Sequence, residues 1–344
     1  MAPDGSLRYP FPDYPAVDDA TEVAPGIYWL STVLPFRLRA INLWLLKDGA
    51  GWTIVDCGYA RDDVRAHWQA VWRKYLGGRP VTRLIVTHFH PDHLGNSRWL
   101  CDTWGLLPHM TESEWLHGRL AVLDIHTDSI EQRVRFYAAH GLDEARLQRF
   151  RDEVVRYSDG VQIPESYVRI VDGQVIEIDG YSWRVIVGHG HAPEHACLYC
   201  DERTILISGD QVLPQITPNV SVWPPEPDAD PLKDYFATIE RLRATVRPDS
   251  LVLPSHRKPF YGIRERLDAI ERHHHERLER VMARIGGEAV SAGEVANFLF
   301  PQDLDGHQIG FAMNETLAHL NYLMHRSKLR RSRDAAGRFR FARC

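Results

Sequence analysis

The sequence contains no hydrophobic run long enough to cross a membrane, because no stretch approaches the roughly 18 consecutive apolar residues that a spanning helix requires. Its first 15 residues are rich in proline and aspartate and hold no apolar segment of the kind found in secretory signals. Cysteine is scarce, and the five cysteines have an odd number and a scattered spacing that indicate no disulfide framework. These absences predict a cytoplasmic location and no membrane partner.

An excess of positive charge is also missing. The chain has 41 basic and 46 acidic residues, a formal net charge of −5, which argues weakly against a dedicated nucleic-acid binder. Hydrophobic residues make up 44% of the chain and charged residues 25%, as in ordinary globular proteins. With 344 residues, the chain is long enough for one large domain and one small domain.

The stretch at residues 87–95 is the densest chemical signal in the chain. It reads T-H-F-H-P-D-H-L-G and places three imidazoles and a carboxylate within six residues. The apolar run before it, at residues 83–86, predicts a buried strand. A strand that ends in a tight loop can direct several side chains at one point, and imidazole with carboxylate suits zinc and other divalent transition metals. The stretch therefore predicts a metal site at a strand end.

A polar side chain follows the end of several other predicted strands. Each of these strands is a short apolar run, and a sheet brings such strand ends to a common edge. An amphipathic helix predicted from residue 62 to residue 75 gives the β-helix-β order of an α/β layer arrangement. The strand-end residues are Asp56, His189, His191, Asp210 and His256.

The pattern H-x-H-x-D-H resembles the signature of the metallo-β-lactamase superfamily, and the resemblance extends from about Val23 to about Tyr261. It implies an α/β (α+β) fold, in which an αββα sandwich carries metals at one edge of two packed sheets. It also implies two divalent metal ions. Zinc is the expected metal, although the same ligand set accepts iron and manganese.

The resemblance implies three histidine ligands for the first metal, which are His88, His90 and His191. The third is assigned because G-H-A-P at residues 190–193 aligns with the family's P-G-H-[ST]-P. His189 stands where the family has a proline, and it is the rival candidate for the third ligand.

The second metal matches Asp92, His93 and His256, and Asp210 matches the carboxylate that bridges both metals. A carboxylate between two dications offsets their repulsion, and the two metals can share one hydroxide that acts as the nucleophile. The resemblance therefore implies catalytic roles for Asp92 and Asp210, with Asp92 orienting the hydroxide.

Further residues are expected around the ligands. Asp56 matches an aspartate that supports the metal loop from behind in family members, and a strand-end turn is its alternative role. His195, four residues after His191, is expected either behind the ligands or as a packed strand histidine. Three residues after the last ligand are predicted to hold an anionic arm of the substrate, as in the glyoxalase II branch, with plain surface positions as the alternative: Arg257, Lys258 and Tyr261.

The resemblance favours a hydrolase that cleaves a small ester or thioester and is similar to hydroxyacylglutathione hydrolases. The β-lactamases of this superfamily lack the bridging carboxylate that Asp210 would supply. Its lactonases carry a catalytic tyrosine three residues later, where this chain has Leu213. A β-lactamase or lactonase activity is therefore disfavoured, and the expected partner is a small-molecule substrate.

A metal-dependent nuclease for single-stranded RNA is the alternative function. The same metal chemistry could cleave a phosphodiester, and a cationic C-terminus would be the contact face for nucleic acid. The acidic balance of the rest of the chain disfavours this alternative. The basic residues concerned are Arg326, Lys328, Arg330, Arg331, Arg333, Arg338, Arg340 and Arg343.

The chain is predicted to have an extended N-terminal arm at residues 1–22 and a catalytic domain at residues 23–262. Residues 168–178 and 181–187 of that domain are predicted to form a hairpin around Asp179-Gly180. A helical insertion at about 112–158 is predicted to contain helices at 112–123, 129–140 and 144–157. It could serve as a lid, as extra packing, or as a dimer contact in a homo-oligomer.

The remaining residues, 263–344, resemble the small winged-helix-like tail of one branch of the superfamily. A charged helix is predicted at residues 264–285, and its His273-His274-His275 run is expected to be solvated rather than to bind metal. Ser291 and Glu294 form the capping box of a short helix. An amphipathic helix at 312–326 and a terminal hairpin complete the outline.

Overall fold

The computed structural model describes residues 6–36, 38–123 and 128–344. Contacts divide these residues into two units, of which the first comprises the described residues up to 123 together with 157–218 and 241–268. The second comprises the described part of 124–156 together with 219–240 and 269–344. Residues 219–240 and most of the predicted insertion thus group with the C-terminal region. The sequence-based division assigned both to the catalytic domain, and its boundary near residue 262 stays a prediction.

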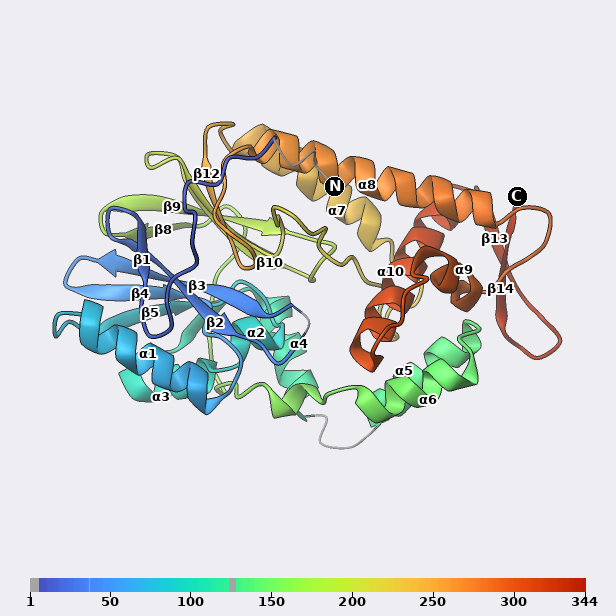
Figure 1. The fold of residues 1–344 in the computed structure, drawn as a ribbon, viewed down its shortest axis with the longest axis horizontal. Coiled ribbons are helices and arrows are strands. Elements are labelled where there is room, and N and C mark those ends of the chain that lie inside the picture. The colour runs from blue at the N-terminus through green and yellow to red at the C-terminus, as the bar shows by residue number, and fades with distance from the viewer. Residues whose placement is uncertain (1–5, 37, 124–127) are drawn as a thin grey trace. The chain divides into compact units, whose positions relative to one another are not determined.

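Within the described residues, the larger sheet of the first unit has seven strands that lie side by side in chain order (Figure 1). Strands β1 to β4 pair antiparallel, whereas β4 to β7 pair in parallel. The predicted Asp48-Gly49 turn joins β3 to β4, and Gly49 adopts a φ of +57°, which costs glycine little. The strands are β1 (Thr21–Ala24), β2 (Ile27–Val33), β3 (Ala40–Asp48), β4 (Gly51–Val55), β5 (Val81–Ile85), β6 (Pro108–Met110) and β7 (Val168–Arg169).

The smaller sheet of the first unit has the order β12-β11-β10-β9-β8. Only β11 and β12 pair in parallel. Asp179 and Gly180 both have positive φ, as a two-residue type I′ hairpin requires, and they join β8 to β9 as predicted. The strands are β8 (Val175–Ile178), β9 (Tyr181–Gly188), β10 (His195–Cys200), β11 (Ile205–Gly209) and β12 (Leu251–Pro254).

The prediction that residues 168–178 form one strand is wrong. The segment turns at Gly173, whose φ is +76°, and its two halves belong to different sheets. β7 pairs with β6 of the larger sheet, whereas β8 pairs with β9 of the smaller sheet. The segment therefore passes from one sheet to the other, and its apolar residues alone did not reveal the break.

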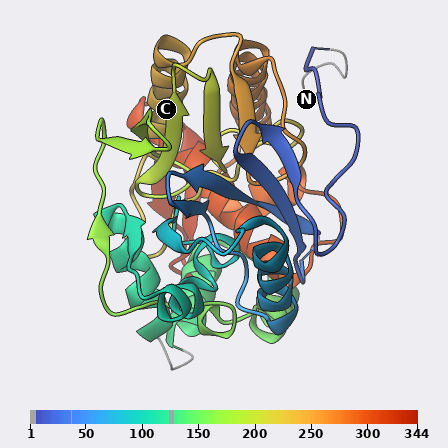
Figure 2. The same ribbon diagram turned by 90° about the vertical axis from the view of Figure 1, so that its left-hand side faces the viewer.

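One core of the first unit lies between the two sheets, which face each other in Figure 2. Trp29 and Trp44 of the larger sheet share this core with Trp183 and Leu198 of the smaller one, and all four side chains are almost fully buried. Burial of each such side chain contributes about 1.5–3 kcal/mol. The chain thus forms the mixed α/β sandwich that the resemblance implied.

Helices cover the outer face of the larger sheet. Val64, Trp68 and Val71 form the buried stripe of α1 and pack in a second core cluster with residues of β3 to β5. Their i, i+4, i+7 spacing is the signal that predicted this helix. The helices of this part of the first unit are α1 (Asp62–Tyr75), α2 (Pro91–Leu94), α3 (Ser97–Trp104) and α4 (Glu112–Leu123).

The pairing pattern brings several strand ends to one edge of the sandwich. β4 and β5 are parallel, so their carboxyl ends point the same way. β11 is parallel to β12, and β9 runs the same way because β10 lies antiparallel between β9 and β11. The loops that follow these five strands carry every residue that the sequence marked as a candidate ligand.

The second unit contains the remaining helices and a terminal hairpin within the described residues. β13 pairs antiparallel with β14 over five residue pairs. The hairpin and the helices before it follow the predicted order, and the winged-helix comparison stays a proposal. The elements are α5 (Asp128–Ala139), α6 (Glu144–Glu153), α7 (Pro231–Thr245), α8 (Ile263–Arg284), α9 (Ala292–Leu299), α10 (Gly306–His325), β13 (Leu329–Arg333) and β14 (Phe339–Arg343), with α7 ending and α8 beginning in the first unit.

Helix boundaries in this unit follow their caps. The Ser291–Glu294 capping box opens α9 as predicted. An equivalent box between Asp305 and Gln308 opens α10 at residue 306, six residues before its predicted start at 312. In the other direction, α6 ends at residue 153 instead of 157, because Val154 is already extended with a ψ of 127°.

The sequence reading missed one helix and misjudged the surroundings of another. Helix α7 (Pro231–Thr245) was not predicted, although apolar residues recur along it at helical spacing. Its Tyr235 and Phe236 contact His274 of α8, which is fully buried. The expectation that the whole histidine run of α8 is solvated is therefore wrong for its central residue. None of the metal-capable groups found among the described residues includes this run.

In the described part of the chain, every helix is too short or too polar to cross a bilayer.

Removal of the α10 cap should destabilise the protein measurably. Asp305→Ala leaves the Gln308 backbone N–H of the first turn without its acceptor, so the free energy of unfolding should fall by about 1 kcal/mol. Glu288→Ala, a change at an exposed loop position, should leave stability within about 0.5 kcal/mol of the parent. Urea melts of both variants test this, and equal stabilities would contradict the capping assignment.

Candidate metal centre

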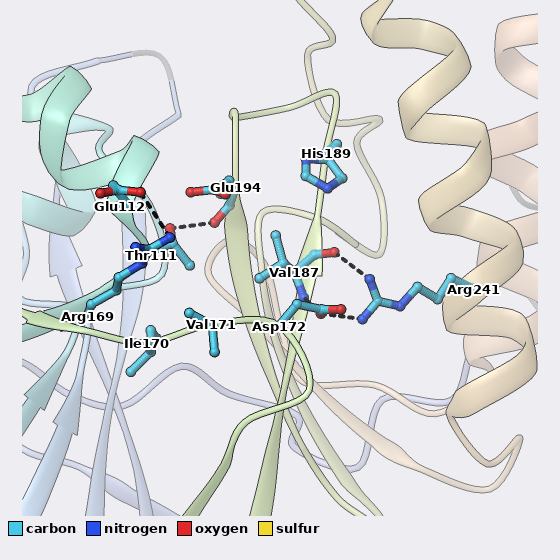
Figure 3. A pocket seen from close by; sticks show the side chains of 10 residues that line it. All are labelled: Thr111, Glu112, Arg169, Ile170, Val171, Asp172, Val187, His189, Glu194 and Arg241. Carbon is cyan, nitrogen blue, oxygen red and sulfur yellow. Dashed lines mark hydrogen bonds and ion pairs between the residues drawn. The ribbon is translucent and has the colours of Figure 1, made fainter.

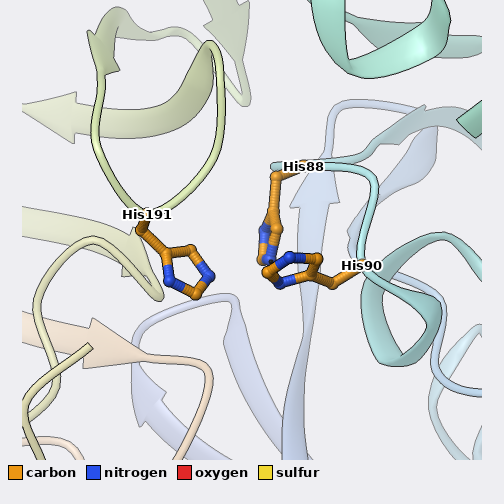
Figure 4. A group of neighbouring side chains, drawn as sticks. All are labelled: His88, His90 and His191. Carbon is orange, nitrogen blue, oxygen red and sulfur yellow. Dashed lines mark hydrogen bonds between the residues drawn. The ribbon is translucent and has the colours of Figure 1, made fainter. Parts of the chain in front are cut away.

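The loop after β5 presents its first two histidines toward each other. His88 Nε2 and His90 Nδ1 are 2.9 Å apart, and the alternation of an extended segment places Phe89 on the opposite side. His191, on the loop after β9, joins them with ring centroids 5.1 Å from His88 and 4.7 Å from His90 (Figure 4). One nitrogen from each ring lies within 4.8 Å of the others. These three histidines are called the first ligand group.

Asp92, His93 and His256 form a second ligand group of the same compactness. His256 Nε2 lies 3.3 Å from Asp92 Oδ2, and His93 Nε2 lies 3.8 Å from Asp92 Oδ1. Proline at position 91 opens α2 and turns the chain, which brings Asp92 and His93 back toward the strand edge. His256 reaches the same place from the end of β12.

Asp210 lies between the two groups. Its Oδ2 is 3.7 Å from His191 Nε2 of the first group and 3.4 Å from His256 Nε2 of the second, while its Oδ1 is 3.6 Å from His93 Nε2. Asp210 also combines with His88 and His93 in a third metal-capable set. The structure therefore brings together all seven residues that the sequence marked as ligands.

The donor atoms fit a divalent metal. His93 Nε2 and Asp210 Oδ1 are both buried and have no hydrogen-bond partner among the described residues, although they face each other. Buried polar atoms are almost always satisfied, so such a pair at one place indicates an acceptor of lone pairs that the polypeptide does not supply. Imidazole and carboxylate together suit zinc and related cations.

His88 and His90 of the first ligand group are held in the neutral form that a metal requires. Burial, followed by the surrounding imidazoles, keeps the pKa of His88 well below its ordinary value. Burial and the His191 ring likewise lower the pKa of His90 to about 3. Neutral imidazole nitrogens carry the lone pair that binds a cation, so these two residues need lose no proton.

The second ligand group is electrostatically different. Burial alone would lower the pKa of His256, but the Asp210 and Asp92 carboxylates raise it to about 10. Burial opposes ionisation of Asp92, yet the His93 and His256 rings bring its pKa down to about 2. Protonated imidazoles thus balance the buried carboxylates, and a dication could replace those protons.

Asp56 supports the ligand loop from behind. Its Oδ2 is 2.7 Å from His93 Nδ1, and its Oδ1 accepts a hydrogen bond from the Thr87 backbone N–H at 2.8 Å. Asp56 adopts a φ of +61°, a conformation that aspartate tolerates better than most residues and that turns its carboxylate toward the loop. The contact orients the His93 ring with Nε2 toward Asp92 and Asp210.

His195 is the first residue of β10 and also lies against the first ligand group, so both expected placements apply to it. It is fully buried, its ring stacks on that of His88 at 4.7 Å, and its Nε2 accepts the Asp210 backbone N–H at 3.1 Å. Gly209 makes room for this contact, because a Cβ there would lie 2.4 Å from His195 Cε1. His195 therefore positions Asp210 without belonging to either ligand group.

The rival ligand His189 is directed elsewhere. Its Nδ1 is 2.6 Å from the Pro193 carbonyl oxygen, and the side chain is exposed. It lines a pocket of about 310 Å³ at the side of the loop, in which each guanidinium is paired with a carboxylate (Figure 3). The metal-capable sets found among the described residues include His191 and not His189.

Of the three predicted substrate residues, two contact the N-terminal segment and one is exposed. Lys258 donates to the Pro12 carbonyl and lies over the Tyr14 ring, while Tyr261 pairs with Arg8, whose guanidinium covers the Tyr261 ring at 3.9 Å. Both are thus engaged with the N-terminal segment. Arg257 is exposed beside His256, with its φ at +70°. A substrate role for the three stays a prediction.

Sequence reasoning missed Glu114, a fully buried residue of α4. Burial raises the pKa of its carboxyl to about 7, although two backbone N–H groups act to lower it. Those N–H groups belong to Phe89 and Glu194, on the two loops that carry the first ligand group. In the sequence, Glu114 is only an acidic residue in the first turn of a predicted helix. Such a residue indicates where a helix begins and does not indicate a contact with a ligand loop.

Two family models match the chain. One, described as the metallo-beta-lactamase superfamily, matches residues 37–256, and the other, described as the metallo-beta-lactamase-like C-terminal domain, matches residues 278–344. Among solved structures, a beta-lactamase domain protein from Burkholderia ambifaria is 43% identical, with a TM-score of 0.91 and 98% of each chain covered. The first model spans both ligand groups and Asp210.

Curated relatives are more distant. A probable metallo-hydrolase of Bacillus subtilis (strain 168) is 22% identical over 294 residues, which cover 84% of this chain and 89% of that protein. An atrochrysone carboxyl ACP thioesterase of Aspergillus fumigatus is 22% identical over 245 residues, which cover 70% of this chain and 58% of that protein.

Asp210→Ala should cost the protein about one metal equivalent, because the variant lacks the carboxylate that faces both ligand groups. Elemental analysis after dialysis against metal-free buffer measures the loss. The exposed Asp249→Ala should keep the parent stoichiometry. Two tightly bound metals in the Asp210→Ala protein would contradict the bridging position.

Asp56→Asn should weaken metal binding about 10- to 100-fold, because the amide keeps the shape of the side chain but removes the charge that orients His93. Competition with a chromogenic chelator measures the affinity. Asp63→Asn, which changes an exposed carboxylate on α1, is the matched control. Parent-like affinity in Asp56→Asn would show that the ligand loop does not need this support.

Proposed function

Because the chain belongs to the metallo-β-lactamase superfamily and is a metallo-hydrolase, we propose that it cleaves a small ester or thioester, in the manner of a hydroxyacylglutathione hydrolase. The proposal includes two divalent metal ions, with zinc as the natural choice for this donor set. A small-molecule substrate and a cytoplasmic location complete it.

The position of Asp210 is the observation that carries this proposal. A single carboxylate lies within 3.4–3.7 Å of imidazoles from both ligand groups, a position from which it could offset the repulsion between two adjacent cations. The thioesterase among the more distant relatives supports the choice of bond. Position 213 holds a buried leucine, so the tyrosine expected of a lactonase has no counterpart there.

Two bound metal ions would supply a water of lowered pKa and a Lewis acid for the substrate carbonyl. The chain's own groups orient the reactants. Asp92 is ionised at neutral pH, since its pKa lies at about 2, and it can accept a hydrogen bond from the attacking water. Attack of a water oxygen on the acyl carbon would break the C–S or C–O bond, with one water proton passing to the leaving sulfur or oxygen and the other leaving with the carboxylic acid product.

Arg257 is the best placed of the three predicted substrate residues. It directly follows His256, and Asn42 Nδ2 donates to its backbone carbonyl at 2.5 Å, which fixes the turn. Its exposed guanidinium is available for a carboxylate arm of the substrate. Lys258 and Tyr261 are proposed to contribute only where the substrate displaces the N-terminal segment.

The nuclease alternative receives less support. Several arginines of the C-terminal hairpin already bind acceptors within the second unit: Arg331 pairs with Asp228 at 2.7 Å, and Arg340 pairs with Glu294 at 2.9 Å. A cationic surface that neutralises its own acids binds phosphates less well.

One set of assays tests the proposal. Metal-loaded protein should hydrolyse S-lactoylglutathione or an aryl acetate faster than a lactone, and it should leave labelled single-stranded RNA intact. The apoprotein is the control for each substrate. Turnover of RNA alone, sensitive to salt and abolished by Arg330→Ala with Arg331→Ala, would overturn the proposal in favour of the nuclease.

A further inference from the structure

Glu114 of α4 joins the two loops that carry the first ligand group. Its Oε2 accepts the backbone N–H of Phe89 at 2.9 Å, and its Oε1 accepts the backbone N–H of Glu194 at 2.6 Å. Phe89 stands between His88 and His90, and Glu194 follows His191 by three residues. A single planar carboxylate therefore fixes the distance between two loops that are far apart in sequence.

The same loops are also joined nearer to the sheet, where the Ala196 N–H donates to the Thr87 carbonyl at 2.8 Å. That contact joins the two loops where they meet the strands. It does not reach the turns that carry the histidines. Glu114 acts further along, beside the ligands themselves. Together the two contacts define both the separation of the loops and the angle between them.

Contacts from the start of α4 reinforce this arrangement. Glu194 Oε2 accepts the backbone N–H of Ser113 at 2.8 Å, and the Thr111 hydroxyl donates to the Glu194 carbonyl at 2.8 Å. Glu194 thus satisfies an N–H in the first turn of α4 while its own N–H is held by Glu114. Three hydrogen bonds therefore join the start of α4 to the His191 loop. The helix side and the loop side both contribute donors and acceptors to them.

The position of α4 itself is tightly determined. Gly118 faces Leu94 of α2, and a Cβ at that glycine would lie 2.7 Å from Leu94 Cδ2, so the helix packs closely on α2 and a larger residue would require the Leu94 side chain to shift. Beside Gly118, the Tyr157 hydroxyl donates to the Phe89 carbonyl. A buried carboxylate with no role is costly, and here every contact of Glu114 is directed at a ligand loop.

We propose that Glu114 is a positioning residue that sets the location of His191 relative to His88 and His90, and so tunes the first metal site. The inference rests on the metal centre of the proposed function, but it does not depend on which bond the protein cleaves. Helix α4, predicted only as part of an insertion, would thereby act as a support for the metal site.

Glu114→Gln tests this role. The amide retains one acceptor oxygen, but its NH2 group faces a backbone N–H, so one of the two contacts is lost at nearly constant volume. Affinity for one of the two Zn²⁺ equivalents should fall 10- to 100-fold in chelator competition. The visible absorption of the Co²⁺-substituted protein should shift, because the ligand geometry at one site changes.

The matched control is Glu112→Gln, which removes an exposed carboxylate two residues earlier on the same helix. It should leave both Zn²⁺ affinities and the Co²⁺ spectrum at parent values. A Glu114→Gln protein with two parent-like Zn²⁺ affinities and an unchanged Co²⁺ spectrum would overturn the proposal, since a merely structural carboxylate would alter melting temperature and not the ligand field.

If Glu114→Gln does not fold, Thr111→Val carries the test. It removes the hydroxyl that binds the Glu194 carbonyl and preserves volume, so it should cause a smaller change of the same kind in the Co²⁺ spectrum. An unchanged spectrum in that variant would overturn the proposal. Absence of ester or thioester turnover by the parent protein would instead count against the proposed function alone.

Discussion

Buried carboxylates at the edge of the sandwich impose the constraint on which the rest of the site depends. Asp56 and Asp210 are buried and the Asp92 side chain is 16% exposed, and an unpaired charge in such a place costs several kcal/mol. The structure compensates them with the imidazoles of His93 and His256, whose nitrogens face carboxylate oxygens. The same placement that keeps these charges tolerable also gathers imidazole and carboxylate donors into sets that could hold a metal ion.

Strand ends explain why the ligands could be predicted from sequence. Each ligand segment follows a short apolar strand, and the dense H-x-H-x-D-H pattern identified the edge at which the others had to meet. Glu114 could not be found in this way. It acts through the backbone N–H groups of Phe89 and Glu194, and every residue except proline has such a group, so no residue type in either loop marks the contact.

The fold likewise contains elements that the sequence pattern predicts and elements that it does not. The hairpin at Asp179-Gly180 and the helix at residues 62–75 were predictable, because turn chemistry and helical spacing are local properties. The break within residues 168–178 was not, since apolar residues suit a strand of either sheet and only tertiary pairing separates β7 from β8. Helix α10 began early because an aspartate at residue 305 supplied a cap that outweighed the weaker apolar pattern of its first turns.

The division of labour between the two units follows from the location of the donors. Every metal-capable set found among the described residues belongs to the first unit. The second unit instead contains Arg277 beside Glu315 and a hairpin whose Arg331 and Arg340 bind carboxylates of their own unit. Partly exposed ion pairs such as those of the hairpin contribute little to stability, and their charges are already matched within the unit. The groups capable of metal chemistry are therefore those at the strand ends of the sandwich, and the segments around Arg257 and Glu194 lie close to them in sequence.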